Sequence, residues 1–216
     1  RLYQFGGHIN FEKDGDRFHE REYFYADANF FEIFDVEWIT GDPNTALDKG
    51  YAIVIDEDWA IRLFGRTDVI GKSLDSGGPN PFVVTGVIKN RPQNSHLQYK
   101  ILVGLPANEE GVISFLESWD RYGAYTYVLL EENASASEFG KKMPDFVSKY
   151  FDEEIPRTIE FQALADIHFY SQNIEYANDS NRGQILYVYI FLGVGIFMLV
   201  IACINYMNLA TAKSLH

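Results

Sequence analysis

The pattern of apolar and polar positions changes once along the chain, close to residue 185. Before this point, short apolar runs alternate with turn-forming residues, and no constant repeat or low-complexity linker separates them. After it, the segment ILYVYIFLGVGIFMLVIACI, from Ile185 to Ile204, contains no charged residue. A helix of this length rises about 1.5 Å per residue and spans about 30 Å, which matches the hydrocarbon core of a bilayer. The pattern therefore predicts a folded region followed by one apolar helix.

The folded region is expected to contain both strands and helices. Asp56 stands between a buried strand, YAIVI, and a helical segment, EDWAIRLFG, whose last glycine is placed to end the helix, so we expect Asp56 to be its cap. Asp27 is expected to cap a shorter helix, ANFFEIF, and Ser135 with Glu138 forms a capping box for a helix reaching about Phe151. Further strands are predicted in EYFYAD, PFVVTGVI, LQYKILVGL, AYTYVLLEE and TIEFQAL, and ADIHFYSQNIEYANDSNRG is expected to be a polar connection into the apolar run. This order favours a mixed α+β fold.

Charge is distributed unevenly along the chain. There are 31 Asp and Glu against 18 Lys and Arg, a net charge of −13, and every acidic residue precedes Ile185. Such a negative field repels phosphate backbones, and no basic stripe interrupts it, so nucleic acid is not an expected partner. The single cysteine, Cys203, lies in the apolar run, which leaves the folded region without a disulfide or a Cys-based metal site. The opening residues, RLYQFGG, show no initiator Met and no signal-peptide pattern, and we expect the chain to be a piece of a longer protein.

The patterns that could indicate chemistry fail on spacing. GRTDVIGKS resembles a phosphate-binding loop, but five residues separate its glycines where four are needed, and it follows a predicted helix, so we interpret it as a helix-ending turn followed by a strand. The histidines show no metal-ligand spacing, and His168 is expected to be a packed or capping residue. The acidic clusters at residues 56–58, 109–110 and 152–154 are interpreted as solvated faces and helix starts. We therefore expect no catalytic residue, no cofactor and no metal.

The apolar run has the features of a membrane span. It lacks the polar stripe of an amphipathic core helix, and tyrosines stand near both of its ends, as in the aromatic belts of membrane proteins. One basic residue on each side, Arg182 and Lys213, leaves the orientation undecided from charge alone. The residues assigned to the span are Ile185, Tyr187, Tyr189, Gly193, Gly195, Phe197 and Ile204.

Five segments stand in a characteristic order along nearly the whole chain. They are ADANFFEIFDVEWITGDPNTAL, VIDEDWAIRLFGRTDVIGKSL, FVVTGVIKNRPQNSHLQYKILVGL, LADIHFYS and FMLVIACINYMNLATAKS. Together they resemble the extracytoplasmic domain and the second membrane helix of MacB/FtsX-type ABC transporter permeases, especially those found in Bacteroidetes. The stretch IACINYMNLATA carries the most characteristic part of this resemblance.

The resemblance implies a permease subunit in the bacterial inner membrane, with four membrane helices and a large periplasmic domain between helices one and two. Residues 1–182 would form an N-terminally incomplete periplasmic domain with a porter-like α/β part and a β-rich part, residues 183–205 the transmembrane helix, and residues 206–216 the start of a cytoplasmic segment. Four residues match the cytoplasmic end of that helix: Asn205, Tyr206, Asn208 and Lys213.

The resemblance also implies partners and a mode of action. A cytoplasmic ABC ATPase would hydrolyse ATP, so this subunit would not itself be an enzyme. A second permease copy, the lipid bilayer and a periplasmic adaptor are the other partners. In this family, motion of the ATPase is relayed through the membrane helices to the periplasmic domain, a mechanism called mechanotransmission that serves efflux and related transport.

Two interpretations from other classes stay open. One is a membrane-anchored periplasmic hydrolase or binding protein, which requires a concave pocket with a cluster of perturbed ionisable residues. The other is a single-span adhesion or signalling domain, which would need no ATPase.

Overall fold

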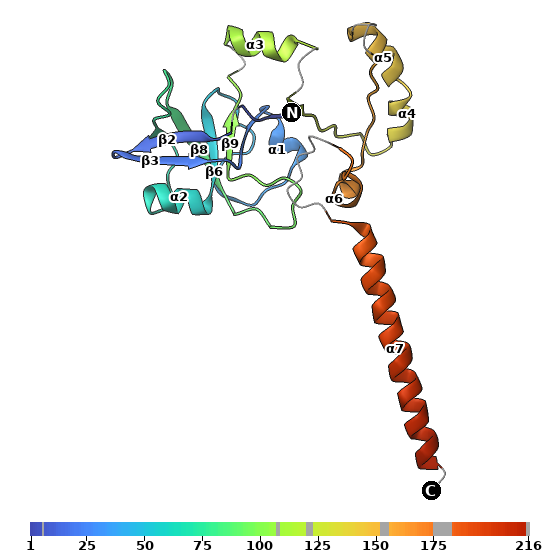
Figure 1. Ribbon diagram of the computed structural model, residues 1–216. Helices are drawn as coiled ribbons and strands as arrows, with labels where there is room; N and C mark the ends of the chain where they lie inside the picture. Colours follow the sequence, from blue (N-terminus) through green and yellow to red (C-terminus); the bar gives the residue numbers. More distant parts are fainter. Residues whose placement is uncertain (6, 107–108, 120–122, 152–155, 175–182, 215–216) are drawn as a thin grey trace. The chain divides into compact units, whose positions relative to one another are not determined.

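The computed structural model describes residues 1–5, 7–106, 109–119, 123–151, 156–174 and 183–214 (Figure 1). The chain divides into two compact units, Arg1–Phe161 and Gln162–His216. Strands and helices mix in the first unit, and a long helix, α7 (Ile185–Ser214), makes up most of the second. The predicted mixed α+β fold followed by one apolar helix is therefore confirmed.

The first unit is built on one mixed sheet. In chain order the strands of the unit are β1 (Leu2–Tyr3), β2 (Ile9–Lys13), β3 (Asp16–Glu20), β4 (Tyr23–Ala26), β5 (Trp38–Gly41), β6 (Ala52–Asp56), β7 (Ser73–Leu74), β8 (Phe82–Ile88), β9 (Ile101–Gly104) and β10 (Ala124–Tyr125). The strands of the sheet lie in the order β10-β1-β4-β9-β6-β8-β5, with β7 paired to β8, and a separate hairpin joins β2 to β3. The pairs β4/β9 and β6/β8 are parallel, whereas β6/β9 and β5/β8 are antiparallel.

Both faces of this sheet are buried. Because side chains alternate along a strand, Ile53 and Ile55 of β6 lie in one apolar cluster with Phe11 of the hairpin and Trp59 of α2 (Glu57–Phe64), whereas Val54 lies in a second cluster. The second cluster also contains Phe24, Phe30, Leu47, Tyr99 and Leu102. The near-continuous apolar sequence of β6 follows from this double burial.

The helix after β6 begins and ends as the sequence predicts. The backbone N–H of Trp59 donates to Oδ1 of Asp56 at 2.8 Å, and Gly65 follows the helix in the left-handed conformation, with φ of 70°. The strand β7 comes shortly after this turn, which agrees with the reading of GRTDVIGKS as a turn and a strand. Asp56 is a helix start, as predicted, but at 3 % exposure it is buried and is no part of a solvated face.

Four local predictions are corrected by the structure. Asp27 does not cap the short helix α1 (Phe30–Ile33); its carboxylate accepts from Nε of Arg1 at 3.0 Å, and Asn29 occupies the cap position. Within LQYKILVGL only β9 is a strand. Within AYTYVLLEE only β10 is a strand, because β10 pairs with β1 and β1 has just two residues. TIEFQAL forms no strand, and within it Phe161 packs on Phe139 with ring centroids 4.9 Å apart.

The helix predicted after Ser135 is two helices. The Ser135 cap is present, since Oγ accepts from the N–H of Glu138 at 3.4 Å, but α4 (Ala136–Gly140) ends early and α5 (Met143–Tyr150) begins after two intervening residues. Pro144 lies in the first turn of α5, and its missing N–H prevents one continuous ladder of hydrogen bonds through this point. An eight-residue helix, α3 (Glu110–Glu117), lies earlier in the same unit.

The ionisation of Asp56 predicts a pH dependence of stability. Burial, the largest effect, raises the pKa of this carboxyl from 3.8 to about 6, so folding favours the protonated form. This contribution to the free energy of unfolding is fully present below about pH 4 and is lost as the pH rises through about 6. In Asp56→Asn the free energy of unfolding should not show this decline with rising pH. Asp56→Ala should also lack the decline, and its free energy of unfolding should be lower by about 1 kcal/mol because the helix cap is lost.

Urea unfolding of the detergent-solubilised chain, followed by tryptophan fluorescence between pH 4 and pH 7, measures this difference. The neighbouring exposed residue gives the matched control, Asp58→Asn, which should keep most of the decline. An Asp56→Asn variant with the same pH profile as the unmodified chain would show that the buried carboxyl is not the source.

Candidate functional site: an apolar helix, its junction and a tyrosine pocket

All the residues assigned to the membrane span lie on α7. Ile185 is its first residue, and Tyr187, Tyr189, Gly193, Gly195, Phe197, Ile204, Asn205, Tyr206, Asn208 and Lys213 follow within it. The stretch Ile185–Thr211, of 27 residues, is the one helix in the described part of the chain that is long and apolar enough to cross a membrane. Large apolar side chains are exposed on all its sides, including Phe191 at 73 % and Phe197 at 66 %. The helix continues beyond Ile204, so the four residues assigned to the cytoplasmic end share one rigid element with the apolar run.

A set of close contacts around Gly183, which we call the Gly183 junction, precedes α7 within the second unit. The N–H of Gly183 donates to the backbone oxygen of His168 at 2.9 Å, and Nε2 of Gln172 donates to the oxygen of Gly183 at 3.0 Å. A Cβ at Gly183 would lie 2.5 Å from Nε2 of His168 and 3.1 Å from the ring of Phe169. These partners belong to α6 (Ile167–Tyr170) and the turn after it, which follow a short 3-10 helix, η1 (Leu164–Asp166).

This junction was only partly foreseen. His168 was expected to be a packed or capping residue, but its side chain is exposed, although its ring lies near Phe169 and the position of Gly183. The segment around it was expected to be a polar connection, whereas it forms η1 and α6. Residues 175–182, which include Arg182, lie outside the described residues.

Buried acids in the first unit have structural partners. Oε2 of Glu20 accepts from Nε1 of Trp59 at 2.8 Å, and Oε1 accepts from the N–H groups of Arg21 and Glu22. Burial raises the pKa of Glu20, but these hydrogen bonds and Lys100 outweigh it and hold the pKa below its usual value. Glu20 therefore fixes the hairpin to α2 as a carboxylate, and Asp56 is the cap of that helix.

Neither acid matches the site that a hydrolase would need. Asp56 and Glu20 line neither the tyrosine pocket described next nor the cavity of about 480 Å³ beside α5. Among the described residues, no group of three or more His, Cys, Asp or Glu is placed to hold a metal ion. The cluster at residues 152–154 lies outside the described residues.

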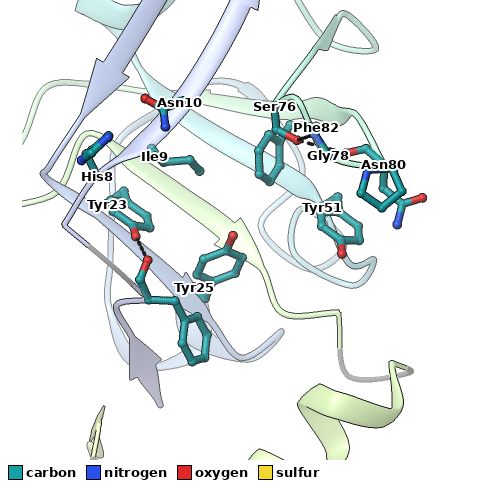
Figure 2. A pocket seen from close by; sticks show the side chains of 12 residues that line it. His8, Ile9, Asn10, Tyr23, Tyr25, Tyr51, Ser76, Gly78, Asn80 and Phe82 are labelled. Atoms are coloured by element: carbon teal, nitrogen blue, oxygen red, sulfur yellow. Dashed lines mark hydrogen bonds between the residues drawn. The ribbon is translucent and has the colours of Figure 1, made fainter.

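A cavity of about 310 Å³, which we call the tyrosine pocket, opens in the first unit and is lined by Phe5, Tyr23, Tyr25, Tyr51, Asn80 and Phe82 among others (Figure 2). Tyr23 and Tyr25 alternate along β4 and so share one face of the sheet. Tyr51 comes from the residue before β6, and Phe82 from the start of β8. Strands that are distant in sequence thus bring these rings together.

The hydroxyl groups of the pocket are held in defined positions. Tyr23 donates to the backbone oxygen of Phe5, and Tyr51 donates to Oε1 of Glu109 at 2.6 Å. Burial, together with the nearby Tyr23, Tyr51 and Glu109, raises the pKa of Tyr25 to about 12, so this hydroxyl stays protonated at any physiological pH. The sequence analysis did not find this pocket, although the i, i+2 spacing of Tyr23 and Tyr25 in a predicted strand was an available signal.

The first unit is similar to known periplasmic domains. The family model of the MacB-like periplasmic core domain matches residues 4–146. A search of curated proteins gives no match. Among solved structures, a domain of a Porphyromonas gingivalis protein named as a permease is 21 % identical, covers 77 % of this chain and 75 % of its own, and has a TM-score of 0.54. At this identity the likeness shows a shared fold.

Two further solved structures are more distant. The periplasmic region of MacB from Actinobacillus actinomycetemcomitans is 14 % identical, with 66 % of this chain and 63 % of that chain covered and a TM-score of 0.47. The extracellular domain of the ABC-type transporter YknZ from Gram-positive bacteria is 19 % identical, with 51 % and 57 % covered and a TM-score of 0.37. The family match includes every strand of the sheet except β1 and extends into α5, well over half of the chain. The chain therefore belongs to the family of MacB-like periplasmic core domains.

Proposed function

We propose that the chain is part of a permease subunit of an ABC transporter, in which the folded region lies in the periplasm and α7 crosses the inner membrane. The observation that carries the proposal is an exposed helix, apolar on all sides, that follows a MacB-like periplasmic core domain in one chain. A surface of this kind is costly in water and favourable in hydrocarbon. Residues 1–182 are then the periplasmic part, 183–205 the span and 206–216 the start of the cytoplasmic segment.

The proposal assigns the energy source to a partner. The subunit itself is not an enzyme, and a cytoplasmic ABC ATPase hydrolyses ATP. A second permease copy and a periplasmic adaptor complete the assembly, and the mode of action is export or mechanotransmission. The continuity of α7 from Ile185 to Ser214 supports this role, because one unbroken helix can transmit a displacement along its axis.

Copurification from the native host tests the proposed function. The full-length protein, tagged and extracted in a mild detergent, should bring down a protein with ATPase motifs, identified by mass spectrometry. ATP hydrolysis by the purified complex should require that partner. Recovery of the full-length protein with no ATPase subunit under these conditions would favour the single-span signalling or adhesion domain.

Membrane insertion tests the role of α7. Each Asp near the centre of a span costs about 2.5–3.5 kcal/mol, whereas each Leu, Ile, Phe or Val contributes about −0.3 to −0.6 kcal/mol. The pair of changes Val194→Asp and Phe197→Asp should therefore offset most of the favourable contribution of the run and abolish insertion. Carbonate extraction of membranes from expressing cells measures the inserted fraction.

The matched control for insertion changes the same two positions without adding charge. Val194→Leu with Phe197→Leu should leave the inserted fraction unchanged. Full insertion of the double Asp variant would argue that α7 packs against protein and not lipid.

The junction at Gly183 predicts local protection from hydrogen exchange. Its N–H is bonded to the backbone oxygen of His168, and a larger residue would meet the rings of both His168 and Phe169, so Gly183→Val should displace this segment and weaken the hydrogen bond. The amide at position 183 should then exchange at least about fivefold faster, the effect of losing roughly 1 kcal/mol. Hydrogen–deuterium exchange with mass spectrometry on the chain in nanodiscs gives the readout.

A glycine farther along the helix gives the control for this measurement. A Cβ at Gly193 would meet nothing within 4 Å, so Gly193→Ala should leave exchange at position 183 unchanged. Unaltered protection in Gly183→Val would mean that α6 does not hold the beginning of α7.

A further inference from the structure

The tyrosine pocket has an aromatic wall on several sides. The Phe5 and Tyr25 rings meet edge to face with centroids 5.3 Å apart, Tyr23 and Tyr25 do so at 6.1 Å, and Tyr51 and Phe82 are tilted at 5.8 Å. In Figure 2 the rings of Tyr25, Tyr51 and Phe82 surround one space. Edge-to-face contact leaves parts of the ring faces uncovered, and these faces carry the negative side of the aromatic quadrupole.

The backbone of Tyr51 is strained at this position. Tyr51 has φ of 65°, in the left-handed region that non-glycine residues seldom adopt. Two hydrogen bonds hold it there, from its own N–H to the oxygen of Gly104 at 3.2 Å and from the N–H of Val83 to its oxygen at 3.0 Å. Strained residues of this kind are concentrated at binding sites, where the surrounding structure maintains them. The strain places the Tyr51 ring and hydroxyl at the pocket.

The carboxylate of Glu109 does not line the pocket, but it contacts two uncharged residues that do. Oε1 of Glu109 accepts from the Tyr51 hydroxyl at 2.6 Å and lies 3.5 Å from Nδ2 of Asn80, and both donors line the pocket. Glu109 precedes α3, yet its side chain makes no cap bond to that helix. Among the described residues, no Lys or Arg forms an ion pair with Glu109, and none lines the pocket.

These features select one class of ligand. Aromatic faces attract a cation placed within about 6 Å of the ring centre, and a nearby carboxylate adds a favourable charge interaction. The acidic folded region also raises the local concentration of cations. An anion would meet Glu109, and a neutral ligand would gain nothing from the carboxylate. A volume of about 310 Å³ is sufficient for a small organic group.

We propose that the tyrosine pocket binds an alkylammonium group, with the group held against the rings of Tyr25, Tyr51 and Phe82 and its charge facing Glu109. The site is separate from the proposed permease role. Its ligand binding can be measured whether or not an ATPase accompanies the protein.

Binding of a cation and of its neutral isostere to the chain tests the proposal. The chain is kept at pH 8 in a maltoside detergent, which has no choline headgroup. Choline and 3,3-dimethylbutan-1-ol have nearly the same shape and differ in charge, and ligand-observed NMR compares their dissociation constants. Choline should bind at least about fivefold more tightly.

Variants separate the rings from the charge. Glu109→Gln keeps the hydrogen-bond acceptor and removes the charge, so it should weaken choline about fivefold and leave the neutral alcohol unchanged. Tyr25→Leu should weaken choline by a similar factor. The adjacent change Glu110→Gln, on the first residue of α3, is the matched control and should have no effect.

A third arm identifies the source of the ammonium group. Butylammonium represents a primary amine, such as a lysine side chain, and choline represents a quaternary headgroup. The ligand that binds more tightly indicates which of these two groups the pocket takes. Equal affinity for choline and its neutral isostere would overturn the proposal. Unchanged choline binding in Glu109→Gln would overturn it as well, and this conservative variant remains informative if Tyr25→Leu does not fold.

Discussion

The structure depends on one physical constraint, which is that the surface of α7 must be kept from water. From Ile185 to Ile204 the helix presents no charge, and its large side chains are exposed on every side. Burying such side chains is worth about 25 cal/mol per Å² of apolar surface, a sum that few other interactions in the chain can match. The distribution of charge agrees with this constraint, since every acidic residue lies before Ile185. The chain thus has an acidic, hydrophilic part before Ile185 and a hydrophobic helix after it.

The folded region provides a stiff body because its sheet is buried on both faces. Val54 and Leu102 point to one cluster, while their neighbours on β6 and β9 point to the other, so each central strand is packed from two sides. Trp59 takes part in both packing and hydrogen bonding. Its ring packs on Phe11, its backbone N–H donates to Asp56, and its indole N–H donates to Glu20. A body packed in this way transmits a displacement with little internal loss, since close-packed interiors are poorly compressible.

Local signals in the sequence were sufficient where the cause is itself local. Asp56 and Gly65 stand at the two ends of α2 because their side chain and backbone conformation act within a few residues, and the sequence shows both. The uncharged run predicted α7 for the same reason. Strand lengths were less predictable, because AYTYVLLEE can pair only as far as β1 extends, and that length is set by a distant segment. The hairpin β2–β3 was not predicted. The tyrosine pocket was not predicted either, since its residues come from segments as distant in sequence as β2, β4 and β8, which only the folded sheet brings together.

The length of α7 has a consequence for how it would sit in a bilayer. Its apolar stretch Ile185–Thr211 has 27 residues. At about 1.5 Å per residue such a stretch measures about 40 Å, which exceeds a hydrocarbon thickness of about 30 Å. Hydrophobic mismatch of this kind is relieved by inclination of the helix or by local thickening of the lipid. Hydrogen bonds at the Gly183 junction connect the beginning of α7 to α6 and the turn after it. If α7 spans a bilayer, a change in its inclination would therefore also act on α6, so that α6 would respond to the thickness of the membrane.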